Sequence, residues 1–273
     1  MTQARSNTVR DFEHAGWEAA ASQYERLFAG ATKHYVGALL EGTHTSAHTH
    51  LLDVACGPGF AAANAREIGA TAVGIDFSAA MIAVARSRYA DINFIEADAT
   101  ALPFERRSFD AVISNFGVHH FENPARAFEE FNRVLKPFGH LAFTIWAKPH
   151  ENPAWRLIMD AISASGTFDV PMPAGNDNRN SLDNFIELTQ SAGFFDVRAE
   201  QLEMPWRMPV DTDLVTLFER STVRMSSLIR GQRPEALLAI RRHVAQSVET
   251  YLKDGAIELG TKAYIVLASK HQS

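Results

Sequence analysis

Short apolar runs alternate with longer amphipathic segments through the middle of the chain. The apolar runs lie at residues 51–55, 72–76, 93–97, 109–114 and 141–146. In most of the segments between them, apolar residues recur every three or four positions, which is the spacing of one helix face. Continuous apolar strands separated by helices predict a parallel sheet that is covered on both faces, with right-handed crossovers. We therefore predict a doubly wound α/β fold, whose ligand crevice lies beyond the carboxyl ends of the strands.

Local signals predict where the helices of this region begin and end. Ser78 and Asn123 are predicted N-caps, because their short polar side chains can accept hydrogen bonds from the first free amides of a helix. Pro124 stands at the first helical position after Asn123. Pro137 and Gly139 are predicted to end that helix before the fifth strand begins.

The two flanks of this region follow other patterns. Residues 11–40 have helical spacing, whereas the regular alternation lapses after the fifth strand. The later elements are predicted as helices starting at 153, 181, 211 and 234 and strands over 195–208 and 263–268. Ser181 and Asp211 are predicted N-caps, Gly255 is the predicted end of the last helix, and 169–180 is predicted to be a mobile loop. The helices between the last two strands are predicted to form an inserted cap.

Composition excludes several classes of protein. The chain holds 26 Lys+Arg against 32 Asp+Glu, a net charge of -6, so we expect neither nucleic acid nor an anionic membrane as a partner. Hydrophobic residues make up 46% of the 273 residues, which argues against disorder, and no apolar run approaches the ~20 residues of a membrane span. A single cysteine excludes an internal disulfide and a zinc site built from several thiolates. The polar N-terminal stretch lacks the apolar core of a secretory signal, so the predicted location is the cytoplasm.

Three histidines gather in the loop before the first strand, at His44, His48 and His50. Imidazoles at close spacing can bind a metal, but an exposed polar connector is the simpler interpretation. No metal site is predicted.

Glycines and acidic residues mark the carboxyl ends of the first three strands. Gly57 and Gly59 follow the first strand and open a helix, so the backbone can turn tightly beside a ligand. Asp53, Asp76 and Asp98 lie at the ends of successive strands. A carboxylate after the second strand can accept both hydroxyls of a ribose, whereas three acids would repel a pyrophosphate. The G-x-G-x-x-G spacing is also missing, so the pattern favours a cationic nucleoside and argues against a nicotinamide dehydrogenase.

The same segments resemble the motifs of class I S-adenosylmethionine-dependent methyltransferases. Residues 53–59 resemble the first motif, 73–81 the second and 96–104 the third, while 109–121 and 133–137 resemble the fourth and fifth. The chain resembles the ubiquinone/menaquinone-biosynthesis subgroup, methyltransferase type 11. The resemblance implies a Rossmann-like, mostly parallel sheet of seven strands with the last strand antiparallel, covered by an N-terminal helical lid. It also implies S-adenosyl-L-methionine as cofactor and S-adenosylhomocysteine as product.

The resemblance divides the chain by task. We predict a single methyltransferase domain over 1–273, in which 51–147 is the cofactor-binding core. Residues 1–50 are predicted to form the lid, and 148–180 with 209–256 are predicted to be substrate-cap segments.

The positions that the resemblance assigns to cofactor binding are Tyr24, Asp53, Ala55, Gly57, Gly59, Asp76, Phe77, Met81, Asp98, Ala99 and Asn115. Asp53 and the backbone at Ala55 and Gly57 would face the methionine group. Asp76 would hold the ribose hydroxyls, while Phe77 and Met81 would enclose the adenine. Asp98 and the Ala99 amide would read the adenine edge, and Asn115 would lie near the sulfonium.

Two further features follow from the family pattern. Trp17 and Tyr24 resemble the aromatic residues of its N-terminal lid. Ala55 and Phe138 depart from the pattern, because each stands where a glycine is usual. We expect the change at Ala55 to narrow the glycine-rich turn slightly, and the change at Phe138 to affect a turn far from the chemistry.

His119 and His120 are the candidate catalytic bases, because they follow the fourth strand at the mouth of the crevice and imidazole titrates near neutral pH. A hydrogen bond to the backbone is an equally open role for either of them, and His150 is a weaker third candidate. Methyl transfer is an in-line displacement that positioning alone can accelerate, so a base matters only for a hydroxyl or acidic carbon acceptor.

The predicted acceptor is a small, partly apolar or aromatic molecule that is methylated on oxygen or carbon. The aromatic residues expected to line its site are Phe116, Trp146, Trp155, Trp206 and Phe218. A cyclase or decarboxylase that keeps the cofactor without transferring its methyl group is an alternative, and so is a non-catalytic binding module on the same fold. The sequence assigns no oligomeric state.

Overall fold

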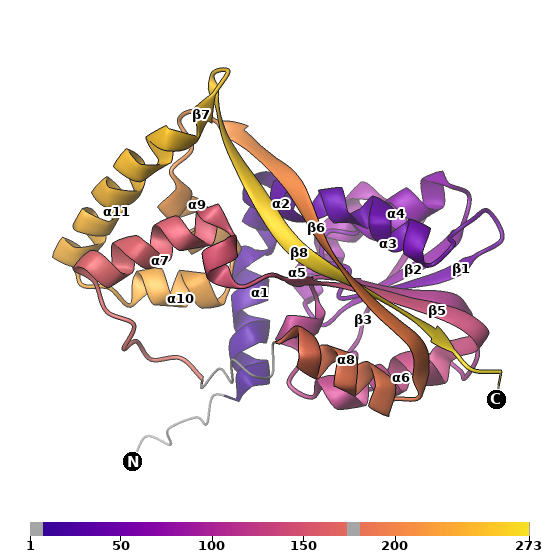
Figure 1. Cartoon of the computed structure of the whole chain (residues 1–273). Coiled ribbons are helices and arrows are strands. Elements are labelled where there is room, and N and C mark those ends of the chain that lie inside the picture. Colours follow the sequence, from indigo (N-terminus) through magenta and orange to yellow (C-terminus); the bar gives the residue numbers. More distant parts are fainter. Residues whose placement is uncertain (1–7, 174–180, 273) are drawn as a thin grey trace, which may run out of the picture.

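The sheet of the protein has the predicted doubly wound arrangement (Figure 1). The computed structural model describes residues 8–173 and 181–272, and the 8-stranded sheet has the order β3-β2-β1-β4-β5-β8-β6, with β7 paired to β8. The strands are β1 His50–Val54, β2 Thr71–Asp76, β3 Asn93–Glu96, β4 Phe109–Asn115, β5 Leu135–Trp146, β6 Phe194–Pro209, β7 Leu252–Lys253 and β8 Ala256–Lys270. The pairs among β1 to β5 are parallel, whereas β8 is antiparallel to both β5 and β6. The α/β fold with an antiparallel last strand is confirmed, and the short β7 is an addition to the seven strands predicted.

Successive residues of the central strands pack on opposite faces of the sheet, because side chains alternate along a strand. On one face, Leu51 and Ile113 pack with buried residues of helices α3 (Val36–Gly42), α4 (Phe60–Glu67) and α5 (Ala79–Arg88). On the other face, Leu52 and Val112 pack with α6 (Pro124–Val134) and α8 (Leu182–Ser191). The two helical layers leave the carboxyl ends of the strands as the place where a ligand can reach the sheet.

The predicted helix caps are confirmed at three positions. The Ser78 hydroxyl accepts a hydrogen bond from the Met81 amide at 3.1 Å, and the Asn123 side chain accepts one from the Arg126 amide at 3.1 Å. Ser181 caps α8 in the same way. Each cap satisfies an amide that lacks a partner inside its helix, and this fixes where the helix begins.

The N-terminal segment folds as a chain of helices, α1 (Val9–Leu27), α2 (Ala29–Thr32), the 3-10 turn η1 (Lys33–Tyr35) and α3. Helix α1 packs against α5 of the core and also against α9 (Leu214–Ser221) of the cap. This long helix therefore touches both halves of the molecule, and it runs between them in Figure 1.

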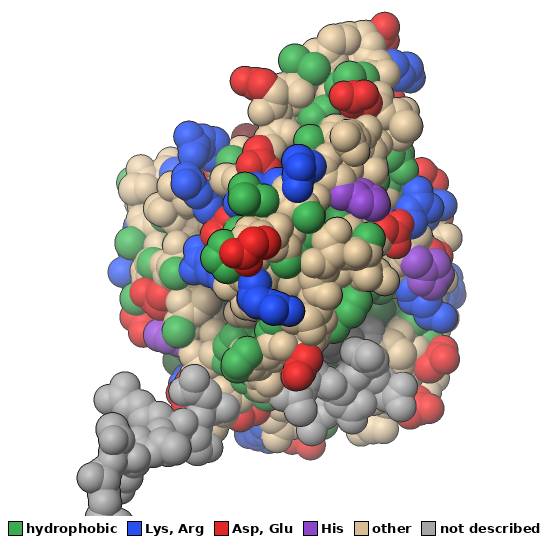
Figure 2. Space-filling model, turned by 90° about the vertical axis from the view of Figure 1, so that its left-hand side faces the viewer, with side chains coloured by type: hydrophobic (Ala, Val, Ile, Leu, Met, Phe, Trp, Pro, Cys, Tyr) green, Lys and Arg blue, Asp and Glu red, His purple; other side chains and the backbone are tan. Residues whose placement is uncertain are grey.

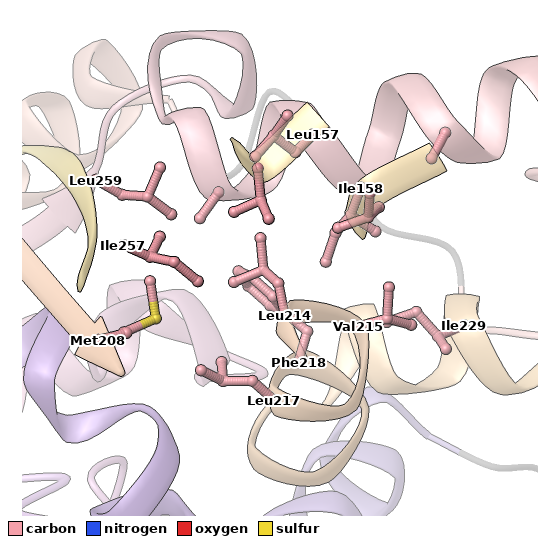
Figure 3. Close-up of a cluster of buried hydrophobic side chains, with 14 of the residues drawn as sticks. Leu157, Ile158, Met208, Leu214, Val215, Leu217, Phe218, Ile229, Ile257 and Leu259 are labelled. Atoms are coloured by element: carbon pink, nitrogen blue, oxygen red, sulfur yellow. The ribbon is translucent and has the colours of Figure 1, made fainter. Parts of the chain in front are cut away.

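The cap is a helical cluster with a hydrophobic core of its own (Figure 3). Its helices are α7 (Pro153–Ser165), α9, α10 (Arg224–Arg230) and α11 (Pro234–Val248). Ile158, Phe218 and Ile240 are fully buried there, and Met208 and Ile257 reach the same cluster from β6 and β8. These two long strands extend beyond the rest of the sheet and carry the cap at their far end (Figure 1). None of the helices in the described ranges has the length and apolar character needed to cross a membrane.

The predicted end of the helix before β5 is wrong. The helix ends at Val134, and β5 begins at Leu135 rather than after Gly139. Leu135 pairs with Phe109, but the next paired residues are His140 and Ala111. Residues 136–139 therefore form a bulge, in which a proline need not donate to the ladder and Phe138 adopts a φ of 62°.

Two predicted boundaries in the cap are also wrong. The N-cap of α9 is Asp213 rather than Asp211, because the Asp213 carboxylate accepts the Thr216 amide at 3.0 Å. The last cap helix, α11, ends at Val248 rather than at Gly255. Asp254 and Gly255, with φ of 49° and 73°, instead form the two-residue turn between β7 and β8. An Asp-Gly pair with both φ positive is typical of a hairpin turn. Residues 174–180 of the predicted mobile loop lie outside the described residues.

Candidate active site

A cavity of about 290 Å³ lies at the carboxyl ends of β1, β2, β3 and β4, where the fold class predicts a ligand site. The predicted cofactor positions that line it are Tyr24, Asp53, Ala55, Gly57, Asp76, Phe77, Met81, Asp98, Ala99 and Asn115. Gly59 and the candidate base His119 do not line it, whereas His120 does. The structure thus brings together residues from five separate segments of the sequence.

The glycine-rich turn after β1 is shaped by three residues in the left-handed region of backbone space. Ala55, Gly57 and Gly59 have φ of 56°, 51° and 87°. At Gly57 an added Cβ would meet nothing within 4 Å, so the cavity reaches the backbone there. At Gly59, the N-cap of α4, a Cβ would stand 2.6 Å from the Phe94 ring. Ala55 keeps the backbone conformation that a glycine adopts more easily, which costs about 1 kcal/mol.

Asp53 presents an unsatisfied carboxylate oxygen at the base of this turn. Its Oδ2 accepts a hydrogen bond from the Ala62 amide at 3.1 Å, but its buried Oδ1 has no hydrogen-bond partner among the described residues. The side chain is only 1% exposed, and burial raises the pKa of Asp53 to about 8. A buried oxygen without a partner is costly, so the position fits a ligand that brings a donor, above all a cationic one.

Asp76 ties the glycine-rich turn to the start of α5. Its two carboxylate oxygens accept hydrogen bonds from the Gly57 and Ser78 amides, each at 2.9 Å. Burial raises the pKa of Asp76 to about 6, in spite of these hydrogen bonds. Each oxygen keeps a second lone pair, so the carboxylate can hold its turn in place and still accept a ligand hydroxyl.

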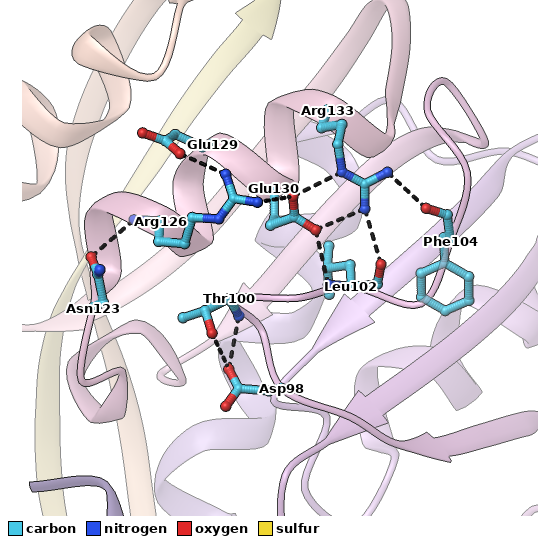
Figure 4. Close-up of polar contacts among 9 residues, drawn as sticks. All are labelled: Asp98, Thr100, Leu102, Phe104, Asn123, Arg126, Glu129, Glu130 and Arg133. Carbon is cyan, nitrogen blue, oxygen red and sulfur yellow. Dashed lines mark hydrogen bonds and ion pairs between the residues drawn. The ribbon is translucent and has the colours of Figure 1, made fainter. Parts of the chain in front are cut away.

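Asp98 is held by its own loop and by the lid. Its carboxylate accepts hydrogen bonds from the amide and hydroxyl of Thr100 and from the Arg10 guanidinium of α1, at 2.8, 2.7 and 3.1 Å (Figure 4 shows the Thr100 contacts). Burial acts to raise the pKa of Asp98, but the bonds from Thr100 and Arg10 outweigh it and the pKa is lowered. Buried Glu130 and Arg133 brace the next residues of this loop through Leu102 (Figure 4).

The lid supplies the aromatic roof of the cavity. Trp17, Tyr24 and Phe28 line it from the α1 side, and the Trp17 and Tyr24 rings meet edge to face at 5.7 Å. Glu18 of α1 fastens this roof to the core, because its carboxylate accepts the Ser78 hydroxyl at 2.7 Å and the Ala80 amide at 3.1 Å. The N-terminus of α5 is thereby capped by a residue from another helix.

The two candidate histidines have different surroundings. His119 Nε2 accepts a hydrogen bond from the Trp146 amide at 3.0 Å, and burial lowers the pKa of His119 to about 3. Because the ring is neutral and its Nε2 already accepts this hydrogen bond, His119 does not fit the role of a base. His120 lines the cavity, and its Nδ1 lies 2.9 Å from the Glu13 carboxylate. His150 is exposed in the 3-10 turn η3 (Pro149–Glu151) and does not line the cavity.

The predicted acceptor-side aromatics separate into two groups. Phe116 and Trp146 line the cavity, with their rings stacked at 3.8 Å. Trp155, Trp206 and Phe218 pack together in the cap instead and do not line it. Next to the stacked pair, the Asn115 amide donates to the Thr32 carbonyl at 3.2 Å and accepts from the Thr144 hydroxyl at 2.8 Å.

Sequence reasoning missed several residues of this site. Arg10, Phe28 and Thr32 line the cavity although none was predicted to do so, and Glu13 holds His120 from below the surface. In the sequence, Glu13 is marked only by its position, because it is an acidic residue that directly follows Phe12 in a segment with apolar residues at helical spacing. That signal says nothing of its partner, which lies 107 positions away.

Comparison with known proteins identifies the central segment. Residues 52–143 match the family described as the methyltransferase domain. This segment is similar to class I methyltransferase domains. A demethylmenaquinone methyltransferase of Chlorobaculum tepidum is 48% identical over 90 residues, which is 33% of this chain and 37% of that protein. A malonyl-[acyl-carrier protein] O-methyltransferase of Salmonella typhimurium is 33% identical over 147 residues, or 53% of this chain and 58% of that protein.

A solved structure extends the similarity of the methyltransferase domain to the fold of nearly the whole chain. The phosphoethanolamine N-methyltransferase 2 of Haemonchus contortus, in complex with S-adenosyl-L-methionine, superposes with a TM-score of 0.59 at 20% identity. The superposition covers 97% of this chain and 60% of that one. The chain spans less than two thirds of the length of each curated relative named above.

The cavity of the methyltransferase domain fits S-adenosylmethionine, the cofactor of its class. The unsatisfied oxygen of Asp53 matches a cationic group, and the open space above Gly57 lets a ligand approach the backbone. Asp76 and the roof of aromatic side chains supply acceptors and apolar surface for a nucleoside.

Proposed function

We propose that the protein is an S-adenosylmethionine-dependent methyltransferase that acts on oxygen or carbon of a small, partly apolar or aromatic molecule. The observation that carries the proposal is the unsatisfied, buried Oδ1 of Asp53 at the base of the glycine-rich turn. The methyltransferase domain over 52–143 supports it. Bound there, the cofactor would supply a methyl group on a positively charged sulfur.

In this proposal one end of the cavity binds the cofactor and the other end binds the methyl acceptor. Asp53 and the Gly57 backbone bind the amino-acid end of the cofactor, and Asp76 accepts the ribose hydroxyls. Phe77 and Met81 enclose the adenine. Asp98 with the Ala99 amide reads the adenine edge, and Tyr24 and Asn115 adjoin the methionine side chain. Ala55 and Gly59 shape the turn that makes this binding possible.

The proposed acceptor binds against the stacked Phe116 and Trp146 rings, beside Thr32 and His120. A flat apolar wall with a few polar groups suits an aromatic or partly apolar molecule. The substrates in the names of the relatives, demethylmenaquinone and malonyl-[acyl-carrier protein], are consistent with an organic acceptor that is either free or bound to a carrier.

The proposed partner is a small molecule rather than nucleic acid or a membrane. On the face shown in Figure 2, basic and acidic side chains are interspersed rather than gathered by sign, and the net charge is -6. A polyanion would meet no continuous basic surface on that face. Location in the cytoplasm stays a prediction from the sequence.

Calorimetric binding of S-adenosylhomocysteine tests the cofactor half of the proposal. We expect the wild type to bind in the micromolar range and Asp53→Asn to bind about tenfold or more weakly. The variant keeps the hydrogen bond from the Ala62 amide but loses the negative charge. Asp110→Asn is the matched control, because Asp110 pairs with Lys136 and does not line the cavity. Equal affinity in the wild type and Asp53→Asn would contradict the assignment.

Product mass tests the transfer itself. Incubation with S-adenosylmethionine and a panel of hydroxylated aromatic compounds should yield a product heavier by one methyl group. A product of altered structure without that mass increase would point to a cyclase or decarboxylase. Tight cofactor binding without any turnover, together with a co-purifying protein, would favour the binding module.

A further inference from the structure

Glu13 is a buried carboxylate on helix α1, which lines the cavity with Arg10, Trp17 and Tyr24. Its side chain is fully buried, and it lies between the 3-10 turn η2 (Val118–His120) after β4 and helix α10 of the cap. Oε2 lies 2.9 Å from His120 Nδ1, and Oε1 lies 2.8 Å from Arg224 Nε. A buried carboxylate without partners would be strongly destabilising. Glu13 is stabilised by the hydrogen bond with His120 and by the charge of Arg224, although Oε1 itself makes no hydrogen bond among the described residues.

The charge state of Glu13 determines which ring nitrogen of His120 carries the proton. Burial acts to raise the pKa of Glu13, but His120 and Arg224 outweigh it and the pKa is lowered. Ionised Glu13 can only accept, so Nδ1 of His120 must donate the hydrogen bond between them. In the neutral ring Nε2 then carries the free lone pair.

The ring of His120 is placed to use that lone pair at the cavity. His120 lines the cavity, and within the described ranges of the chain its Nε2 makes no hydrogen bond. Trp17 fixes the ring from the side, with the two centroids 4.9 Å apart and the planes at 79°. The neighbouring His119 has the opposite arrangement, since its Nε2 is already occupied by the Trp146 amide.

We propose that Glu13 is the positioning residue for His120, and that His120 Nε2 takes the proton of the methyl acceptor. The inference rests on the proposed methyltransferase activity and goes one step beyond it. In the step, the acceptor oxygen forms a bond to the methyl carbon while the sulfur–carbon bond breaks and leaves its electron pair on sulfur. The hydroxyl proton moves to His120 Nε2, and the resulting imidazolium is stabilised by the Glu13 carboxylate.

The arrangement makes the base depend on three parts of the fold at once. Glu13 comes from the lid, His120 from the core and Arg224 from the cap. The lid and cap are packed closely beside this cluster, because a Cβ on Gly16 would stand 2.4 Å from Val223. A displacement of α1 would therefore remove the group that orients the ring.

The first experiment reads the tautomer directly, by nitrogen NMR of the histidine rings, with His120 assigned through His120→Asn. We expect the Nδ1–H tautomer in the wild type and a shift toward Nε2–H in Glu13→Gln, because the amide has no charge to favour the donating Nδ1. Glu25→Gln is the matched control on the same helix, since Glu25 pairs with Arg88 and does not line the cavity. An Nε2–H ring in the wild type, or the same tautomer in Glu13→Gln, would overturn the inference.

The second experiment separates positioning from binding, with catechol and naphthohydroquinone as acceptor probes. In Glu13→Gln we expect kcat to fall about 10- to 100-fold while KM for the acceptor and the affinity for S-adenosylhomocysteine stay unchanged. Glu13→Asp should restore part of the lost kcat, since it returns the charge at a greater distance. A kcat equal to that of the wild type would refute the role of Glu13.

The two proposals fail in distinguishable ways. Failure of the wild type to bind S-adenosylhomocysteine would refute the proposed function. The tautomer measurement would still decide the role of Glu13, because that measurement needs no methyl acceptor. A rise in KM with constant kcat in Glu13→Gln would also overturn the inference and leave the proposed function intact.

Discussion

The two ends of the cavity are built by different means. The proposed cofactor end is made from the residues at the carboxyl ends of β1, β2 and β3, and each of its acids lies in the last residues of a strand or shortly after it. The acceptor end combines α1, the turn after β4 and the end of β5. One end is therefore set by local strand-to-helix connections, and the other by how a helix from the start of the chain packs across the sheet.

The difference extends to the chemistry of the two ends. Asp53 and Asp76 are buried together without an ion pair to a lysine or arginine of the described residues, and burial raises the pKa of each. Glu13 is equally buried, but His120 and Arg224 lower its pKa. The buried acids of the proposed cofactor end thus have no Lys or Arg partner among the described residues, whereas Glu13 beside the acceptor end forms ion pairs with His120 and Arg224.

The largest expected effect contrasts the cores of the two regions. Phe128→Ala in the sheet core and Phe218→Ala in the cap core should each cost about 3–5 kcal/mol, because both side chains are fully buried. Since the two belong to separate clusters, we expect Phe218→Ala to increase hydrogen exchange in α7, α9, α10 and α11 but to leave β1 to β5 protected. Equal loss of protection throughout the sheet would show that cap and core unfold as one unit.

A second contrast lies within the glycine-rich turn. Gly59→Ala should destabilise the fold by about 2–4 kcal/mol, because the left-handed backbone and a Cβ 2.6 Å from Phe94 act together. Gly57→Ala should cost only about 1–2 kcal/mol, since its Cβ would enter open space. That space belongs to the proposed ligand, so Gly57→Ala should weaken S-adenosylhomocysteine binding more than it lowers stability. Urea unfolding and calorimetry separate the two effects, and an equal loss of stability in both variants would contradict the prediction.

The unpaired acids of the cofactor end predict a pH dependence. The Asp53 carboxyl titrates at an ordinary 3.8 when unfolded and near 8 when folded, so the folded protein holds more protons between these values. The contribution of Asp53 to stability is therefore present at low pH and is lost as the pH rises toward 8, which is opposite to the usual behaviour of an acid. The difference between wild type and Asp53→Asn in urea unfolding at pH 5 and pH 8 measures it.

Ligand binding should lower the pKa of Asp53 and so release the proton that burial retains. The ammonium group of a bound ligand favours the ionised form of Asp53, so we expect S-adenosylhomocysteine binding near pH 7 to release up to about one proton. Calorimetry in buffers of different ionisation enthalpy detects the release, which Asp53→Asn should reduce. Binding without proton release would show that Asp53 is already ionised in the ligand-free protein.

The smallest expected effect concerns the ion pair between lid and core. The side chains of Arg10 and Asp98 are 48% and 33% exposed, so Arg10→Ala should cost at most about 1 kcal/mol, less at high salt. Arg26→Ala on the same helix is the matched control, because Arg26 contacts only Gln23 of its own helix among the described residues. A loss well above that range would mean that this pair holds the lid closed.

Much of the fold follows from pattern alone. Apolar runs predicted the five parallel strands, and the caps at Ser78, Asn123 and Ser181 are where the local chemistry put them. The errors arose where a local signal had two meanings. Gly255 is typical of a helix end but forms a hairpin turn here, and Pro137 is typical of a helix stop but lies in a bulge of β5.

The sequence by itself determined the cofactor end, because parallel strands align their carboxyl ends and adjacent residues carry the acids there. Only the tertiary structure decided the acceptor end. The packing of α1 across the sheet places Glu13 beside His120, while the packing of the turn after β4 against β5 stacks Phe116 on Trp146 and engages His119 with the Trp146 amide. No local pattern encodes contacts across a hundred positions, since they depend on how whole elements pack rather than on how each one forms.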